Sequence, residues 1–598
     1  MDRRLLSTHR YRMKSAVAHF VDGRLFSPKF NDYYAARDPV AETAHVHIHP
    51  ANLVARMSRA NTFTIFEFGF GAGINLLATS TEFLKLAKPN VRLRFISCEA
   101  FPLQHDTLRQ VHDNTAIDKS LSRRLLDFYP PLVSGIYRQL FANDRVELTL
   151  IFADIETALT EFVDQDSVGV DSWMLDGFAP ARNPQMWDAK LIPILAQCTK
   201  ANGTVTSFSS AGTVRRSLED NGFSVQKIEG TPFKRHTLLA TLNESRLQST
   251  EPPRKVTIVG GGFAGTATAH AFARRGIQVQ LMTPSGGVGD ATSSIPTAVL
   301  HPRLSASMEE PAYFRTQTYF YAAALLSQYL QHATTGAVQI SSKNMVAKRL
   351  KDIADTLGKN WARWLDAADC LELTNTEQGY ESTFFPKSIV VNGIELCRSF
   401  VDHPRIEVVA KELFAPIDDE LTIYATASTS VLGKTAEAWE VLTIEGQIDT
   451  FAHSNNNAIP RRVLIQDGYI VPTESACVVG STYEYTQWKP GLATKTNLAK
   501  LQQVTSREHW THLGKFRGLR TVTSDKLPIV GQIDRNQWVN LAHGSAGTAS
   551  TPFCAEILAS QVFGELAPAW QECLSIINPD RFSERQIRRP NPFLRHKR

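Results

Sequence analysis

A short run of residues near the middle of the first half is suited to chemistry at an amine. It reads Asp176-Gly177-Phe178-Ala179-Pro180 and continues as ARNPQMW. An alkylamine has a pKa of about 10.4 and must lose a proton before its nitrogen can attack; a carboxylate can orient it and accept that proton. Asp-Gly after a strand is often only a turn, but the unusual continuation favours a site. We therefore predict that Asp176 is catalytic and that Phe178 contacts the substrate.

A second run contains an arginine suited to holding a carboxylate. It reads GLRTVTSDKLPIVG, residues 518–531, and the arginine is Arg520. A guanidinium can grip a carboxylate through two parallel hydrogen bonds, which lysine does less specifically. A single arginine out of context most often forms a surface salt bridge. Because this one precedes a glycine-rich segment, 541–559, that leads into a helical pattern, we predict that Arg520 belongs to an active site.

The element that would position Asp176 begins with a glycine-rich turn. Residues 62–73, TFTIFEFGFGAG, read as a strand, a tight turn and the start of a helix. At the ends of the next strands, Glu99 could accept hydrogen bonds from ribose hydroxyls and Asp154 from an adenine amino group. Such acceptors suit S-adenosylmethionine, and the alternative is a generic nucleotide-binding turn or a structural loop. The predicted binding residues are Glu67, Gly69, Gly71, Gly73, Glu99 and Asp154.

A second glycine-rich turn predicts a dinucleotide site. Residues 255–265, KVTIVGGGFAG, place Gly-x-Gly-x-x-Gly between a strand and a helix, whose N-terminus can hold a pyrophosphate. The usual ribose-binding acid is missing, since the next strand ends in Met282 and Thr283. FAD is preferred over NAD because residues 290–305 and 541–559 resemble flavin-site segments of the D-amino-acid oxidase and glycine oxidase class, in which the arginine matching Arg520 holds the substrate carboxylate. The predicted FAD-binding residues are Gly260, Gly262, Gly265, Gly544, Ser545 and Gly547.

The wider pattern of the chain predicts two α/β domains. Candidate strands alternate with helical patterns in the first half and end in an antiparallel pair, which predicts a largely parallel sheet flanked by helices. We place an N-terminal Rossmann-like methyltransferase domain at 1–243, a linker at 244–254, and a C-terminal FAD-binding Rossmann domain with an inserted α+β substrate subdomain at 255–598. The candidate strands are 63–68, 92–99, 146–152, 172–176 and 203–209, followed by FSVQKI and HTLLATL.

Composition is that of an ordinary soluble protein. The 598 residues are 43% hydrophobic and 21% charged, which excludes a fibrous or disordered chain. Seven cysteines without a CxxC pair disfavour a disulfide framework and a zinc site. No stretch is apolar for about 18 residues and no secretion signal opens the chain. We expect a cytoplasmic monomer without a metal, with the alternating His45, His47 and His49 on a half-exposed strand.

Taken together, the motifs resemble one bacterial family over nearly the whole chain. Besides the two turns they include FNDYYAARDPVAET, DGFAPARNPQMW, SSAGTVRRSLEDNGFSVQKIEGTPFKRH, GLRTVTSDKLPIVG and INPDRF. In this order they resemble the bifunctional tRNA 5-methylaminomethyl-2-thiouridine biosynthesis proteins. The resemblance implies FAD-dependent removal of the carboxymethyl group from 5-carboxymethylaminomethyl-2-thiouridine at the tRNA wobble position, followed by S-adenosylmethionine-dependent N-methylation of the aminomethyl product.

Lysine and arginine side chains would make most of the contacts with the phosphates of a tRNA partner. An Arg-Arg pair on a helix is also common on a solvated face. Two alternatives remain: a small-molecule amino-acid or sarcosine-type oxidase fused to an unrelated methyltransferase, and a tRNA-binding scaffold whose catalytic sites have decayed. Besides Phe178 and the basic C-terminal tail, the predicted RNA-contacting residues are Arg182, Arg215, Arg216, Lys234 and Arg235.

Overall fold

The chain forms two units that are not contiguous in sequence. The first unit consists of Met1–Pro252 together with Ser560–Gln571, and the second of Pro253–Ala559 together with Glu572–Arg598. The computed structural model describes residues 13–593 apart from 167–168, 230–235, 246, 248–252, 303–309, 331–335, 343–344, 414, 416, 418–419, 428, 455–458 and 506–508. The chain therefore leaves the first unit, returns to it for one short segment, and ends in the second.

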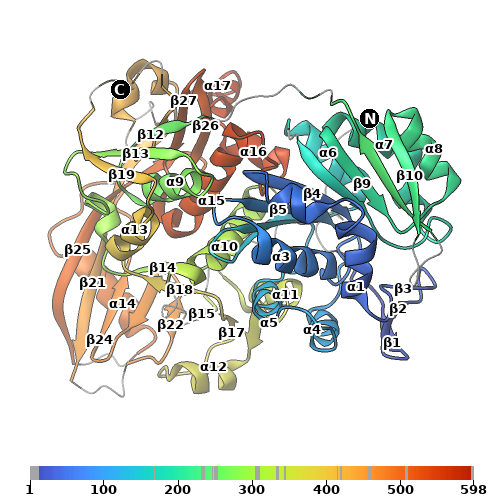
Figure 1. The fold of residues 1–598 in the computed structure, drawn as a ribbon. Coiled ribbons are helices and arrows are strands. Elements are labelled where there is room, and N and C mark those ends of the chain that lie inside the picture. Colours follow the sequence, from blue (N-terminus) through green and yellow to red (C-terminus); the bar gives the residue numbers. More distant parts are fainter. Residues whose placement is uncertain are drawn as a thin grey trace. The chain divides into compact units, whose positions relative to one another are not determined.

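An eight-stranded sheet forms the core of the first unit. Its strands are β4 (Thr62–Phe68), β5 (Arg92–Cys98), β6 (Gly135–Phe141), β7 (Val146–Phe152), β8 (Val170–Leu175), β9 (Thr199–Ser207), β10 (Phe223–Glu229) and β11 (His236–Leu242). Their order is β10-β11-β9-β8-β4-β5-β7-β6 (Figure 1). The strands from β9 to β7 pair in parallel, and antiparallel pairs close both edges. The carboxyl ends of the parallel strands thus share one edge, where ligands of α/β sheets bind.

Helices and a small second sheet complete the first unit. Strand β4 is buried at six of its seven positions, and a strand that is apolar on both faces needs cover on both faces. The helices are α1 (Pro39–Thr43), α2 (Leu53–Met57), α3 (Ile74–Leu86), α4 (His105–Asp113), α5 (Lys119–Asp127), α6 (Ile155–Asp164), α7 (Ile192–Cys198) and α8 (Gly212–Asp220), with a π-helix at Ala44–Ile48 and 3-10 turns at Pro184–Trp187 and Ala189–Leu191. The small antiparallel sheet contains β1 (His19–Val21), β2 (Arg24–Ser27) and β3 (Asp32–Tyr33).

The strand predictions from residue 63 onward are confirmed, but β1, β2, β3 and β6 were not predicted, and one predicted strand is wrong. Strand β6 was not predicted because the buried side chains of Arg138 and Gln139 interrupt its apolar pattern. The predicted strand at His45, His47 and His49 is wrong, because these residues lie in and just after a π-helix. His47 is buried there, with its Nδ1 2.8 Å from the hydroxyl of Thr206, and burial lowers its pKa to about 3.

The second unit begins with a six-stranded nucleotide-binding sheet. Its strands are β12 (Lys255–Val259), β13 (Gln278–Thr283), β19 (Ile406–Ala410), β20 (Thr422–Tyr424), β26 (Ile529–Asp534) and β27 (Gln537–Leu541). Their order is β19-β13-β12-β20-β27-β26, parallel except for the hairpin β26–β27. Helix α9 (Phe263–Ala273) follows β12 after the glycine-rich turn, which confirms the predicted strand, turn and helix.

A mixed sheet with flanking helices forms the inserted α+β subdomain of the second unit (Figure 1). Its strands are β15 (Ala337–Ile340), β16 (Arg363–Leu365), β17 (Ser382–Phe385), β21 (Val441–His453), β22 (Val463–Ile465), β23 (Tyr469–Pro472), β24 (Ala476–Gly480) and β25 (Trp510–Thr523), in the order β16-β17-β15-β22-β23-β24-β21-β25. The other elements of the unit are β14 (Ala298–Leu300), β18 (Ile389–Val391), α10 (Glu310–Tyr329), α11 (Ala347–Leu357), α12 (Ala367–Thr374), α13 (Gly393–Val401), α14 (Leu492–Gln502), α15 (Gly547–Val562), α16 (Gln571–Ile577) and α17 (Arg581–Gln586), with 3-10 turns at Ala291–Ser294, Ser430–Ala436 and Gly544–Ala546.

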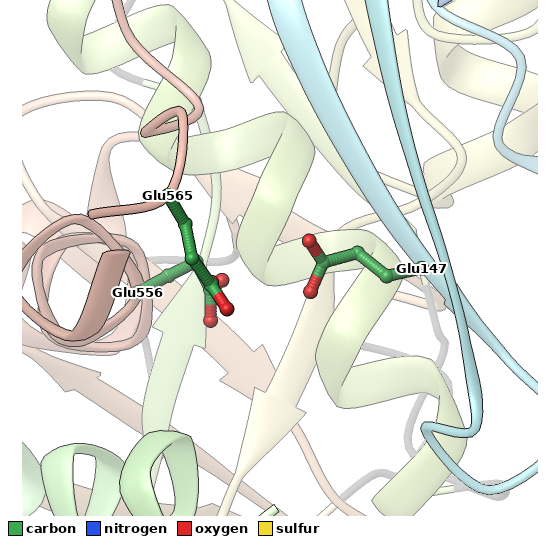
Figure 2. A group of neighbouring side chains, drawn as sticks. All are labelled: Glu147, Glu556 and Glu565. Carbon is green, nitrogen blue, oxygen red and sulfur yellow. The ribbon is translucent and has the colours of Figure 1, made fainter. Parts of the chain in front are cut away.

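The returning segment Ser560–Gln571 is held in the first unit by a buried ion cluster and by apolar packing. Its Glu565, labelled in Figure 2, lies 3.7 Å from the guanidinium of Arg94. The same arginine lies 3.5 Å from Glu147 of β7. Leu566 is fully buried in the apolar core beside the sheet. Because buried charges need partners, the segment completes the core of the first unit rather than merely passing over it.

Glu556, the third carboxylate labelled in Figure 2, belongs to the second unit. It forms ion pairs with Arg274 and Arg275, the latter at 2.7 Å, and accepts a hydrogen bond from the hydroxyl of Tyr321 at 3.1 Å. Since each of the three glutamates in Figure 2 is matched by arginines of its own unit, we assign no metal ion to them.

Two further features concern the described residues as a whole. None of their helices is long and apolar enough to cross a membrane. All seven cysteines are free thiols, and each is buried.

Candidate active sites

The glycine-rich turn of the first unit borders a pocket of about 470 Å³. Gly69 and Gly71 line it, with φ angles of 85° and 52°. Gly73 stands behind the pocket at φ 71°, where a Cβ would lie 2.6 Å from the ring of Phe70. Side chains are strained in this left-handed region, so glycine lets the backbone turn and leaves it open to a ligand.

The three predicted acids Glu99, Asp154 and Asp176 line this pocket, together with Asp32 and Glu42. Glu99 accepts hydrogen bonds from the backbone N–H groups of Gly71 at 2.9 Å and Phe101 at 2.8 Å, which ties it to the turn. Asp154 is exposed and caps the N-terminus of α6. Negative groups favour a cation in their midst, so this lining fits S-adenosylmethionine, whose sulfur carries a positive charge.

Glu67 lies behind the pocket and is only 1% exposed. Its carboxyl is 2.5 Å from the hydroxyl of Ser97 and accepts a hydrogen bond from the amide of Asn75 at 2.8 Å. The same amide donates to Asp176 at 2.7 Å. Burial raises the pKa of Glu67 well above its ordinary value of 4.5, with Asp176 adding to the rise. Sequence reasoning missed Asn75, since no motif marks it.

The raised pKa of Glu67 predicts a specific effect of pH on stability. A neutral Glu67 contributes stability that is complete below pH 4.5 and is lost as the pH rises toward the higher folded-state pKa. Glu67→Gln keeps a neutral acceptor for Asn75 and supplies a donor for Ser97. We expect the melting temperature of wild type to fall relative to Glu67→Gln as the pH rises above 4.5, measured by calorimetry on the full chain. A wild-type advantage that grows with pH would show instead that Glu67 is ionised.

Two aromatic rings from the N-terminal segment pack against Phe178 in the lining of the pocket. Phe30 stacks on Phe178 with centroids 4.4 Å apart and planes at 20°, and Tyr34 meets it edge-on at 5.1 Å. Phe101 contacts Phe30 edge-on with centroids 5.9 Å apart, and the ammonium of Lys29 lies 3.1 Å from the centre of the Phe101 ring. Such faces can hold a base or a cation. Phe30 and Tyr34 belong to the run FNDYYAARDPVAET, but only folding brings this run to Phe178.

A second pocket, also of about 470 Å³, lies in the second unit. Its lining includes Gly262, where α9 begins, and the turn Gly544–Ala546, which leads into α15. Gly265 is buried within α9, and a Cβ there would lie 1.7 Å from the carbonyl oxygen of Gly260. Because any side chain at position 265 would collide with this carbonyl oxygen, only glycine lets α9 pack so closely against the turn. Two helix N-termini beside one pocket fit the diphosphate of FAD.

Arg520 of β25 lines the same pocket and is half-buried. One of its guanidinium nitrogens donates to the carbonyl oxygen of Thr482 at 3.0 Å, and its guanidinium carbon lies 5.1 Å from the ring centre of Tyr483. The guanidinium passes over Gly446 of β21, where a Cβ would lie 2.0 Å from a nitrogen of Arg520. The neighbouring strand thus leaves room for this side chain and directs it to the pocket. Neither Gly446 nor Tyr483 was predicted.

The end of β13 carries no acid that could hold the adenosine ribose. Met282 and Thr283 are both buried there, and among the described residues the hydroxyl of Thr283 has no hydrogen-bond partner. The nearest acid along the chain is Asp290, which is exposed and contacts the hydroxyl of Ser285. The ribose must therefore be held by other groups than a carboxylate on the strand.

Of the predicted RNA contacts, Phe178 lines the first pocket, whereas the basic residues described by the structure do not. Arg182 is exposed outside the pocket lining. On α8, Arg215 forms an ion pair with Glu219 at 3.9 Å and Arg216 is exposed. Lys234, Arg235 and residues 594–598 of the basic tail lie outside the described residues. Arg589, also of the tail, forms an ion pair with Glu440 at 3.3 Å.

Comparison with known proteins agrees with the two pockets. A family of S-adenosyl-L-methionine-dependent methyltransferases matches residues 118–243, and a family of FAD dependent oxidoreductases matches residues 255–405 and 423–561. The tRNA 5-methylaminomethyl-2-thiouridine biosynthesis bifunctional protein MnmC of Chromobacterium violaceum is 30% identical to this chain, over 95% of this chain and 97% of its own length. The chain belongs to this family.

Other members of the bifunctional family match with similar coverage. The MnmC protein of Idiomarina loihiensis is 28% identical over 95% of this chain and 99% of its own length, and that of Thiobacillus denitrificans is 28% identical over 95% and 98%. This family member is therefore a bifunctional enzyme: it has an S-adenosylmethionine-dependent methyltransferase unit and an FAD-dependent oxidoreductase unit.

Solved structures resemble the oxidoreductase part at lower similarity. Glycine oxidase from Geobacillus kaustophilus aligns with a TM-score of 0.42 and 17% identity, covering 53% of this chain and 96% of that one. MNMC2 from Aquifex aeolicus aligns with a TM-score of 0.30 and 20% identity, covering 41% of this chain and 75% of that one.

Proposed function

We propose that this enzyme modifies the wobble uridine of tRNA in two steps on one nitrogen atom. The oxidoreductase, residues 255–598, first removes the carboxymethyl group from 5-carboxymethylaminomethyl-2-thiouridine. The methyltransferase, residues 1–243, then methylates the aminomethyl product to 5-methylaminomethyl-2-thiouridine. The linker 244–254 joins the two activities. The names of its relatives support this substrate.

In the first step Arg520 binds the carboxylate of the carboxymethylaminomethyl group. This contact places the adjacent methylene for oxidation and leaves the nitrogen's proton free to depart. When bound, FAD accepts the hydride from that methylene. Water then hydrolyses the resulting C=N bond, which releases glyoxylate and leaves a primary amine on the uridine.

In the second step Asp176 orients that primary amine beside Phe178. The nitrogen lone pair attacks the methyl carbon of S-adenosylmethionine, the carbon–sulfur bond breaks, and S-adenosylhomocysteine leaves. Asp176 accepts the proton that the amine gives up. Its carboxylate is already oriented by hydrogen bonds from Asn75 at 2.7 Å and from the backbone of Gly177 at 2.8 Å.

The observation that carries the proposal is the match between two polar side chains and two successive substrates. The first substrate bears a carboxylate, and Arg520 lines the flavin-side pocket. The second has lost that carboxylate and presents a primary amine, and Asp176 lines the other pocket. Each pocket thus has the charge that its own substrate needs.

The tRNA partner fits the basic residues of the methyltransferase. We assign its contacts to Arg182, Arg215 and Arg216, with Lys234 and Arg235, because phosphates are met mainly by arginine and lysine. A tRNA substrate places the enzyme in the cytoplasm, and we infer that it acts there as a monomer.

Mass analysis of wobble nucleosides tests the function directly. Cells lacking this protein should accumulate 5-carboxymethylaminomethyl-2-thiouridine, and the wild-type chain should restore 5-methylaminomethyl-2-thiouridine. The purified enzyme should oxidise the modified tRNA and not free glycine or sarcosine. Turnover of those amino acids without tRNA would overturn the proposal in favour of a small-molecule oxidase, and a bound flavin that modified tRNA does not reduce would favour a scaffold.

A further inference from the structure

A buried chain of hydrogen bonds connects α1 with Asp176. Thr43 in α1 donates its hydroxyl to Oδ1 of Asn75 at 2.6 Å. Nδ2 of Asn75, in the first turn of α3, donates to Oδ2 of Asp176 at 2.7 Å and to Oε1 of Glu67 at 2.8 Å. Thr43 is 2% exposed and Asn75 9%. Water therefore competes little for these bonds, and each one restricts the next.

We propose that Asn75 is a positioning residue that holds the Asp176 carboxylate for amine methylation, and that Thr43 holds the amide of Asn75 in place by donating to its oxygen. The inference rests on the proposed function of Asp176. Asn75 itself does not have to touch the substrate. Asn75 acts by fixing the position of the Asp176 carboxylate oxygen that accepts the proton of the amine.

The chemistry of this position favours an amide over other side chains. Two carboxyl groups converge on one nitrogen, and an amide offers two N–H donors without a charge. A lysine here would pair with Asp176 and compete with the substrate ammonium, whereas an aspartate would add a third acid beside Glu67. Because burial raises the pKa of Glu67 and so favours its neutral form, Asn75 can bridge one carboxylate and one neutral carboxyl group.

Both oxygens of Asp176 are anchored, which restrains rotation of the carboxylate. Oδ2 is held by Asn75, and Oδ1 accepts the backbone N–H of Gly177 at 2.8 Å. If the bond from Asn75 is lost, the group can rotate about its Cβ–Cγ bond and the accepting oxygen moves. A displacement of about 1 Å in an active site can cost about 100-fold in rate.

The Asp176 carboxylate prevents the amide from turning over. A flipped Asn75 would direct its oxygen at this carboxylate, which repels it. The hydroxyl of Thr43 also lies 2.9 Å from the carbonyl oxygen of Pro39, but its 2.6 Å separation from Oδ1 of Asn75 requires a hydrogen between these two oxygens. Since Oδ1 carries none, Thr43 donates it and so satisfies the amide oxygen in this orientation.

Substitutions at Thr43 test positioning, because the hydroxyl of Thr43 connects to Asp176 through Asn75. Since Thr43 also lines the pocket, the Kd for S-adenosylmethionine distinguishes positioning from direct contact. Thr43→Val deletes the hydroxyl at nearly constant volume, and we expect kcat for methyl transfer to fall about 10-fold with the Kd for S-adenosylmethionine unchanged. Thr43→Ser should restore the rate. The matched control is Thr79→Val in α3, whose hydroxyl is buried with no partner among the described residues; it should keep wild-type rates.

Asn75→Ala removes both donated bonds at once. We expect kcat for methyl transfer to fall about 100-fold, with the Kd for S-adenosylmethionine and the flavin-dependent step unchanged. The measurements use the full chain and tRNA carrying 5-aminomethyl-2-thiouridine. Melting temperatures of all variants are recorded in parallel, so that loss of folding is recognised as such.

Asp176→Ala, assayed beside these variants, distinguishes the proposed role of Asp176 from the positioning role of Asn75. If Asp176→Ala keeps the wild-type rate, the proposed role of Asp176 fails, and the positioning role of Asn75 fails with it. If Asp176→Ala is slow while Asn75→Ala and Thr43→Val are as fast as wild type, only the positioning role is overturned. It is also overturned if Thr43→Val loses S-adenosylmethionine binding or melting temperature in proportion to its rate.

Discussion

Asp176→Ala is expected to lower methyl transfer about 1000-fold and to leave the flavin-dependent step at its wild-type rate. A positioned acid–base group typically contributes 10²–10⁴-fold, and Asp176 is the pocket carboxylate that follows the central strand β8. The measurement is single-turnover methylation of tRNA carrying the aminomethyl nucleoside. In complemented cells the same variant should accumulate 5-aminomethyl-2-thiouridine.

The matched control for Asp176 is Asp164→Ala, an exposed aspartate at the end of α6. It should methylate as wild type does. Asp176→Asn tests the role more finely, since asparagine keeps one acceptor oxygen but loses the charge. If Asp176→Asn is as slow as Asp176→Ala, proton acceptance dominates, whereas an intermediate rate indicates that orientation contributes separately. Undiminished methylation by Asp176→Ala would exclude this residue from the chemistry.

Arg520→Ala should lower kcat/KM for oxidation of the carboxymethylaminomethyl nucleoside about 1000-fold, because truncating one partner of a charged, partly buried pair costs about 2–5 kcal/mol. The kcat/KM of Arg520→Lys should lie between those of wild type and Arg520→Ala, since an ammonium carries the charge but cannot form two parallel hydrogen bonds to a carboxylate. FAD should remain bound in both variants, as judged by its absorbance. Stopped-flow reduction of the flavin by modified tRNA gives the rates, and cells carrying Arg520→Ala should accumulate the carboxymethylaminomethyl form.

A glycine pair in the same sheet supplies a further test of the Arg520 site. Gly446→Ala places a Cβ where the guanidinium lies, at 2.0 Å, and should displace Arg520 without removing its charge. Gly514→Ala on the partner strand β25 is the control, because no atom lies within 4 Å of its added Cβ. Only Gly446→Ala should slow flavin reduction. Equal rates for the two variants would show that oxidation does not depend on where the guanidinium sits.

The fold could be predicted from the sequence wherever its signal is local. Strands such as β7 and β11 are rich in leucine and other apolar residues over seven positions, and their bounds match the prediction. The turns at Gly69 and Gly260 were visible because positive φ selects glycine at fixed spacings. Strand β6 escaped prediction because its polar residues are buried against partners that only the sheet supplies.

The sequence by itself determined two cofactor-binding turns, the carboxylate after β8 and the arginine of β25, because strand, turn and helix signals act over a few residues. Only the tertiary structure decided which side chains support them. Asn75 reaches Asp176 through the parallel pairing of β4 with β8, and Gly446 lies beneath Arg520 through the pairing of β21 with β25. The segment Ser560–Gln571 joins the first unit from the far end of the chain. Such contacts link residues distant in sequence, and no local pattern records them.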